Sequence, residues 1–276
     1  MPSPVKNMAG QAVSSNLSFG SRRPAKMSAV DNIWRNKFTN PTPNVEYLVV
    51  AGGGTSGVTI YQYGTGSGGG GGFRSSVVGA ASGGGAGAEA VHPVVSGVAH
   101  TITVGASGAD SAFDTIISKG GGSSGGYTSN GTTGGSGGSG SGGTGTSGGA
   151  GTANQGYAGG GGSAAQGSGG AGGAGGAGET SGSGTAGVGL ASSITGASVT
   201  YAKGGSRGWD RTLNPNSGDG GMVTSSHIAG LGDAGIVVIR YADTFDLATS
   251  TTGSPTITTA GGFHVYKFTG SGSITI

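Results

Sequence analysis

The chain has 276 residues, including 70 glycines, 8 prolines and no cysteine, and its formal net charge is +2. The missing cysteines exclude disulfides and thiolate metal sites, and no apolar run approaches the ~18 residues of a membrane-spanning helix. Glycine and proline form about 28% of the chain, a level typical of disordered sequence, yet only 9% of residues are charged, whereas disordered chains are usually rich in charge.

The first 45 residues differ in composition from the remainder. They carry six basic side chains against Asp31 alone, for a net charge of +5, while residues 46–276 carry −3. We therefore predict two parts, a basic arm over 1–45 and a glycine-rich domain over 46–276. A solvated tail is the alternative for the arm, but its large apolar side chains favour docking on a partner. The docking candidates are Arg22, Arg23, Ile33, Trp34, Arg35 and Phe38.

Several short segments of the second part read as β-strands. They are rich in β-branched and aromatic residues, several alternate apolar with polar residues, and glycine-rich stretches bound them. The predicted strands are 46–51, 99–104, 112–118, 198–203, 236–241, 256–259, 263–269 and 273–276. No stretch shows the 3.6-residue apolar period of a helix, so we expect little or no α-helix.

The glycine tracts between these strands have a period of three. Residues 134–140 read GGSGGSG and residues 169–178 read GGAGGAGGAG. Polyproline II has three residues per turn and no internal hydrogen bonds, so its backbone groups need partners from neighbouring helices. Such neighbours approach closely only where glycine faces them. The pattern predicts a bundle of polyglycine II helices, with the alanine or serine of each triplet directed outward.

Two other interpretations of the tracts are a collagen helix and a flexible linker. Collagen requires much proline, and residues 119–187 contain none. A Gly/Ser linker does not account for the strands that bracket the tracts. The predicted fold is therefore mainly β with polyproline or polyglycine II helices, a glycine-rich bundle flanked by β-strands. The residues expected to form its apolar core are Leu48, Val50, Ile102, Val104, Ile116, Val199, Ile236, Val238 and Phe268.

Searches for catalytic and cofactor motifs find no supported site. Gly134–Gly138 matches G-x-S-x-G, but that motif requires a strand-to-helix turn with later Asp and His residues. Matches to G-x-G-x-x-G lack a following helix. The histidines show no close metal-ligand spacing; they are His92, His100, His227 and His264. We expect no enzyme activity, no cofactor and no metal.

Binding is better supported, in the segment 206–216 (SRGWDRTLNPN). Tryptophan and arginine are enriched at interface hot spots, and an aromatic face beside Asn and Asp suits sugars. Packing of Trp209 under its own loop is the alternative. Two further aromatic residues lie on one side of residues 60–63 if that segment is extended; they are contact residues or caps of the bundle. The binding candidates are Arg207, Trp209, Asp210, Arg211, Asn214, Asn216, Tyr61 and Tyr63.

Six sequence blocks, in this order, resemble a known family. They are VEYLVVAGGG, GGGFRSSVVGAASGGGAGAEAVHPV, HTITVGASG, SSITGASVTYAKGG, DAGIVVIRYA and FHVYKFTGSGSITI. The series resembles the glycine-rich domain of phage tail proteins, of marine phages especially, over about residues 46–276. The bundle is also similar in architecture to the polyglycine II sandwich of adhesins at the tips of T-even-type tail fibres. The chain departs from the family pattern at 203–230, where a less glycine-rich insertion follows VTYA.

The resemblance implies a virion-borne tail fibre or fibre-tip adhesin. Its arm would dock on other virion proteins, and its loops would bind a host surface glycan or outer-membrane protein. The resemblance also implies a homo-oligomer, for which a trimer is the usual fibre arrangement. The alternatives are a purely structural capsid decoration or head-fibre protein, and an ice-binding glycine bundle. Nucleic acid is not expected as a partner, because the basic residues are scattered.

Overall fold

The computed structural model describes residues 42–57, 66–126, 129–137, 146–163, 168–180, 184–206, 215–222 and 230–276. Residues Thr42–Ile276 belong to one unit of the chain. In these ranges the fold is mainly β, as the sequence predicts, and its helical content is a single 3-10 turn, η1 (Gly83–Gly85). The domain boundary expected at 45/46 stays a prediction.

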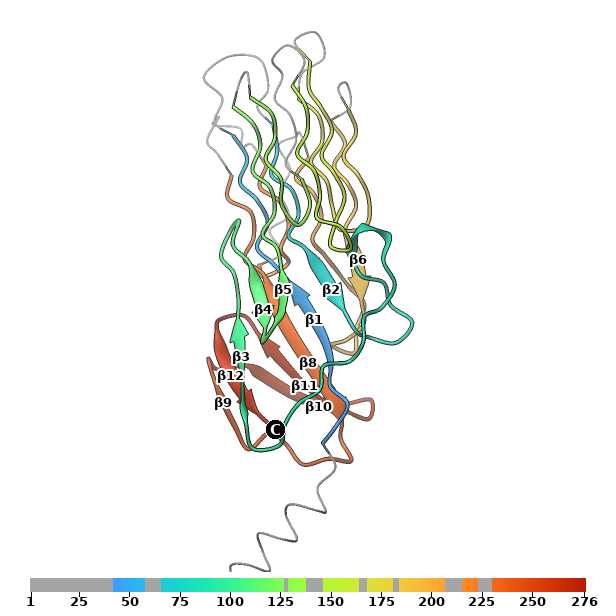
Figure 1. The fold of residues 1–276 in the computed structure, drawn as a ribbon, viewed down its shortest axis with the longest axis vertical. Helices are drawn as coiled ribbons and strands as arrows, with labels where there is room; N and C mark the ends of the chain where they lie inside the picture. The colour runs from blue at the N-terminus through green and yellow to red at the C-terminus, as the bar shows by residue number, and fades with distance from the viewer. Residues whose placement is uncertain are drawn as a thin grey trace, which may run out of the picture. The chain divides into compact units, whose positions relative to one another are not determined.

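Two five-stranded antiparallel sheets and one two-stranded sheet form the β part (Figure 1). The first sheet has the order β10 (Thr256–Ala260), β11 (Phe263–Phe268), β8 (Ile236–Ala242), β1 (Glu46–Val50), β2 (Phe73–Ser75). The second has the order β5 (Ile116–Ser118), β4 (Ser111–Phe113), β3 (Ala99–Thr103), β12 (Gly272–Thr275), β9 (Ser250–Thr252). The short sheet pairs β6 (Leu190–Ser192) with β7 (Val199–Tyr201).

The main apolar core lies between the two larger sheets. From the first sheet it takes Tyr47, Val49, Val237, Ile239, Tyr241, Tyr266 and Phe268, and from the second Ile102, Phe113, Ile116 and Ile274. Strand β3 shows the expected alternation, with His100 and Ile102 buried and their neighbours exposed. The second sheet therefore buries one face, as two antiparallel sheets packed together require.

A second core covers the other face of the first sheet. Leu48 and Val50 of β1 and Val238 of β8 pack there with Ile194 and with Tyr201 of the short sheet. Because the first sheet is covered on both faces, its central strands β1 and β8 are almost continuously apolar and buried. Both strands agree with the sequence prediction to within one residue.

The structure corrects two strand predictions. Residues 112–118 form two strands, β4 and β5, joined by a turn at Asp114 and Thr115. Val199 is 41% exposed rather than buried, although it lies on the same face of β7 as Tyr201, which is buried. The second core covers only the Tyr201 end of this strand. Val104 packs against the core only partly, and the other residues expected in the core are buried.

Strand β1 continues into a glycine-rich segment (Figure 1). This segment keeps the registers of β1 with β2 and β8. The N–H groups of Ala51, Gly54 and Gly57 donate to the carbonyls of Gly72, Gly69 and Gly66, at 3.0, 2.8 and 3.2 Å. Those of Gly53 and Ser56 donate to Asp233 and Gly230, both at 2.9 Å. Gly52 donates to a third neighbour, Ala109, at 3.0 Å. Successive residues thus bond in three directions, and the pattern repeats every three residues.

The glycine segments pack too closely for side chains. A Cβ at Gly54 would lie 2.1 Å from the Gly122 carbonyl oxygen, and one at Gly172 would lie 2.1 Å from that of Tyr157. The expected outward direction of the third residue is wrong for Ala171 and Ala174, which are fully buried. Ala174 packs in the second core, so the tract at 169–178 also covers the sheet.

Candidate functional site

Most residues expected to bind a partner lie outside the described residues. This holds for Tyr61, Tyr63, Arg207, Trp209, Asp210, Arg211 and Asn214, and for the docking candidates Arg22, Arg23, Ile33, Trp34, Arg35 and Phe38. Their roles stay predictions.

Asn216 is the binding candidate that the structure does describe. It is half-buried and has a left-handed backbone with a φ of 62°, a conformation that asparagine tolerates better than most residues. The Ala202 N–H donates to the carbonyl of the next residue, Ser217, at 2.8 Å. Asn216 therefore lies beside the end of β7, at the side of the glycine segments that adjoins the strands.

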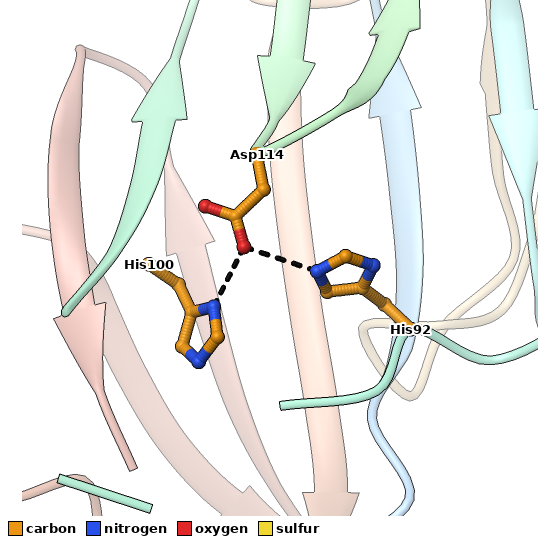
Figure 2. A group of neighbouring side chains, drawn as sticks. All are labelled: His92, His100 and Asp114. Atoms are coloured by element: carbon orange, nitrogen blue, oxygen red, sulfur yellow. Dashed lines mark hydrogen bonds and ion pairs between the residues drawn. The ribbon is translucent and has the colours of Figure 1, made fainter. Parts of the chain in front are cut away.

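A cluster of two histidines and an aspartate lies at the edge of the main core (Figure 2). Asp114 Oδ2 is 2.6 Å from His100 Nδ1 and 3.0 Å from His92 Nε2. The side chains of His92, His100 and Asp114 are 14%, 7% and 22% exposed. One carboxylate oxygen therefore holds both imidazole rings in a largely buried place.

The β4–β5 turn positions the carboxylate. Strand β3 pairs Ile102 with Phe113, so the next pair in register is Thr101 with Asp114. The Asp114 N–H donates to the Thr101 carbonyl at 2.9 Å, and Asp114 Oδ1 accepts from the Thr101 N–H at 2.7 Å. The side chain thus continues the ladder and aims Oδ2 toward the histidines. Asp114 has a left-handed φ of 49°, which aspartate adopts more readily than most residues.

The two histidines come from different elements. His100 lies on the inward face of β3. His92 lies on a segment bridged to Val45, beside the start of β1, and its N–H donates to the Val45 carbonyl at 3.2 Å. Phe113 packs against both rings, with centroids 4.6 Å from His92 and 6.1 Å from His100. Aromatic packing and the shared carboxylate together fix the ring positions.

The hydrogen bonds also place the protons. His100 Nε2 accepts from the Val95 N–H at 3.3 Å, so Nδ1 carries the ring proton and donates to Asp114. Burial raises the pKa of Asp114, but the hydrogen bonds from His100, His92 and the Thr101 N–H outweigh it and lower the pKa below its usual value. The carboxylate is therefore ionised at neutral pH. The cluster offers two imidazole nitrogens and one carboxylate oxygen, a donor set that transition metals use.

A second polar cluster lies around Arg74 of β2. Its guanidinium binds Glu89, with Nη2 2.6 Å from Oε2, and the Tyr47 hydroxyl donates to Oε2 at 2.8 Å. Arg74 and Glu89 line a surface hollow of about 490 Å³ with Asn154 and Gln155. Because Arg74 and Glu89 satisfy one another, the hollow makes a weaker case for a ligand site than the histidine cluster.

Sequence reasoning missed the histidine cluster because it looked for metal ligands at close spacing. His92 and His100 lie eight positions apart, and Asp114 lies fourteen further on, so only strand pairing brings them together. One signal was present. The alternation that puts Ile102 in the core puts His100 there too, and a buried polar side chain requires a partner.

No protein-family model, curated protein or solved structure matches this chain. Among the described residues, no helix has the length and apolar character needed to cross a membrane.

Proposed function

We propose that this chain is a phage virion protein, a tail fibre or fibre-tip adhesin, in which a polyglycine II bundle presents receptor-binding loops. The order of the sequence blocks described above motivates the assignment to a virion. The observation that carries the proposal is the hydrogen-bond pattern of the glycine segments, which repeats every three residues in three directions. Three residues per turn is the period of polyglycine II, and a helix of this shape needs partners on all sides.

Such a bundle is a stiff support for binding loops. Each main-chain bond contributes only ~1 kcal/mol net, but the bonds run between many neighbours and the segments carry few large side chains that could rearrange. Binding residues are commonly carried on loops that a rigid scaffold positions. Residues 58–65, with Tyr61 and Tyr63, connect Gly57 and Gly66, which are bonded at the ends of their segments away from the strands.

The segment 206–216 is the other proposed contact region. It leads from the glycine residues that follow β7 back to Asn216, beside the end of β7. The proposed receptor is a host surface glycan or outer-membrane protein, and several copies of the chain on one particle would add avidity to weak single contacts. The arm over 1–45 would attach the chain to other virion proteins, as a homo-oligomer.

An adsorption assay tests this function. Host cells are incubated with the purified full chain before the phage that carries it is added, and free phage is counted. An adhesin reduces adsorption in a dose-dependent way, and Trp209→Ala weakens the effect while Leu231→Ala, at an exposed residue of the described part, leaves it unchanged.

Absence of competition at saturating protein would contradict the adhesin proposal. Antibody labelling of intact particles then distinguishes the alternative. Label on the tail supports a fibre, whereas label on the head indicates a capsid decoration or head-fibre protein, for which the bundle is a spacer.

A further inference from the structure

We propose that His92, His100 and Asp114 bind a divalent transition-metal ion of the zinc class. Each residue contributes one ligand atom, and these atoms lie within 4.8 Å of one another (Figure 2). Zinc sites use histidine nitrogen and carboxylate oxygen, and three protein ligands leave a fourth position for water. This inference rests on the cluster alone and is independent of the virion function.

Small movements convert the hydrogen-bonded cluster into a coordination site. Ligands ~2.0–2.1 Å from a tetrahedral ion lie about 3.3–3.4 Å from one another. Asp114 Oδ2 is now 3.0 Å from His92 Nε2 and 2.6 Å from His100 Nδ1. It must therefore withdraw by about 0.3–0.8 Å, a distance within reach of side-chain rotation. The two imidazole nitrogens, which lie within 4.8 Å of one another, must come to the same spacing of about 3.3–3.4 Å.

The surrounding contacts favour one orientation of the carboxylate. Oδ1 accepts from the Thr101 N–H at 2.7 Å and keeps this bond while Oδ2 binds the ion. Backbone groups that hold a ligand in this way typically strengthen metal sites.

One contact opposes the ion and limits its affinity. When an imidazole nitrogen binds a metal, the proton of the neutral ring moves to the other nitrogen. For His100 that nitrogen is Nε2, which accepts from the Val95 N–H at 3.3 Å, the longest bond of the cluster. Val95 lies in a turn and is 60% exposed, so its N–H can turn to water. The site therefore binds zinc more weakly than a preformed cage would.

Metal binding would link three parts of the fold. The segment beside the start of β1, strand β3 and the β4–β5 turn each supply one ligand. An ion that binds only the folded chain stabilises it by mass action. We therefore expect zinc to raise the melting temperature.

The test uses the full chain without a histidine tag, titrated with ZnCl2 by calorimetry and with CoCl2 by visible absorption. The test variant is His92→Gln, which removes one ligand but leaves the Asp114–Thr101 pairing in place. The matched control is His264→Gln. His264 is also buried and bonded through both ring nitrogens, to Thr259 Oγ1 at 2.7 Å and the Phe245 carbonyl at 3.0 Å.

We expect one zinc ion per chain, a Co²⁺ absorption band of tetrahedral type and a higher melting temperature with zinc. His92→Gln should weaken zinc at least about tenfold and remove the band, whereas His264→Gln should change neither. Zinc binding by the unaltered chain is enough to test whether the site exists. Failure to bind one ion more tightly than about 1 mM overturns the proposal, and so does binding that both variants weaken equally.

Discussion

Gly70→Ala probes the packing of the glycine bundle directly. The Gly70 N–H donates to the Gly172 carbonyl, and its carbonyl accepts from the Ser136 N–H, both at 3.0 Å. A Cβ at this position would lie 2.3 Å from the Ala202 carbonyl oxygen. Real Cβ atoms essentially never approach closer than 3.0 Å, so the two segments must separate by at least 0.7 Å (3.0 − 2.3).

The cost of that separation can be worked from its parts. Overpacking a close-packed interior costs about 1–3 kcal/mol, and stretching two main-chain bonds loses about 1 kcal/mol each. The added methyl recovers about 0.4–1 kcal/mol by restricting the unfolded chain. We expect the free energy of unfolding to fall by about 2–4.6 kcal/mol, which lowers the melting temperature by about 4–18 °C.

Gly126→Ala is the matched control, because it lies in the same class of tract with room for a methyl group. The nearest atom to its Cβ would be Ser129 Oγ at 3.7 Å, an ordinary contact. Its free energy of unfolding should stay within about 0.5 kcal/mol of the parent chain in guanidinium titrations. If Gly70→Ala and Gly126→Ala have the same free energy of unfolding, the glycine segments are not packed as described. They then cannot be the stiff support proposed for the binding loops.

Three further substitutions test polar side chains of the described part by urea unfolding. The pKa of Glu89 lies below its usual value, because the hydrogen bonds from Arg74 and Tyr47 outweigh the effect of burial. The contribution of Glu89 to stability is therefore present above its unfolded-state pKa and is lost as pH falls through its folded-state pKa. Glu89→Gln should therefore destabilise the chain at pH 7, and the gap should close toward about pH 3. The pKa of Asp219 is raised by burial and by repulsion from Asp233. The ionised carboxylate therefore lowers the stability of the folded chain as pH rises. Asp219→Asn should match or exceed the parent stability at pH 7 but not at about pH 3. A gap that moves the other way with pH would contradict either assignment. The Tyr266 hydroxyl accepts from the Ala248 N–H at 2.7 Å. Tyr266→Phe should lose about 1–3 kcal/mol, and an unchanged midpoint would show that water replaces the hydroxyl.

The strands could be predicted where a sheet face imposes its own period. Strand β3 alternates because one face is buried, and β1 is continuously apolar because both of its faces are covered. The turn at Asp114 and Thr115 escaped notice because it lacks the Asn-Gly or Asp-Gly pairs that mark two-residue hairpins. The exposure of Val199 depends on how far along β7 the second core extends, which the local sequence does not determine.

The histidine cluster shows a different limit of sequence reasoning. Its three side chains are brought together by the bridge at Val45 and by the pairing of β3 with β4. Neither contact leaves a local pattern in the sequence. The alternation of β3 predicts that His100 faces the core. It does not predict the partner of His100, because a carboxylate from any of several turns could bind it.

The strands and the glycine bundle depend on one another through their common register. Leu48, Val49 and Val50 pair with residues 73–75 of β2, and the bonds of Ala51, Gly54 and Gly57 continue the same antiparallel register without a shift. A strand with apolar side chains fixes its register, because a slip of one residue would expose its core face. A segment made mainly of glycine has no apolar face and cannot fix its own register in this way. The two packed β-sheets therefore set the alignment of the glycine segments. After β1, the period of the main-chain hydrogen bonds changes from two residues to three where glycine replaces the apolar side chains.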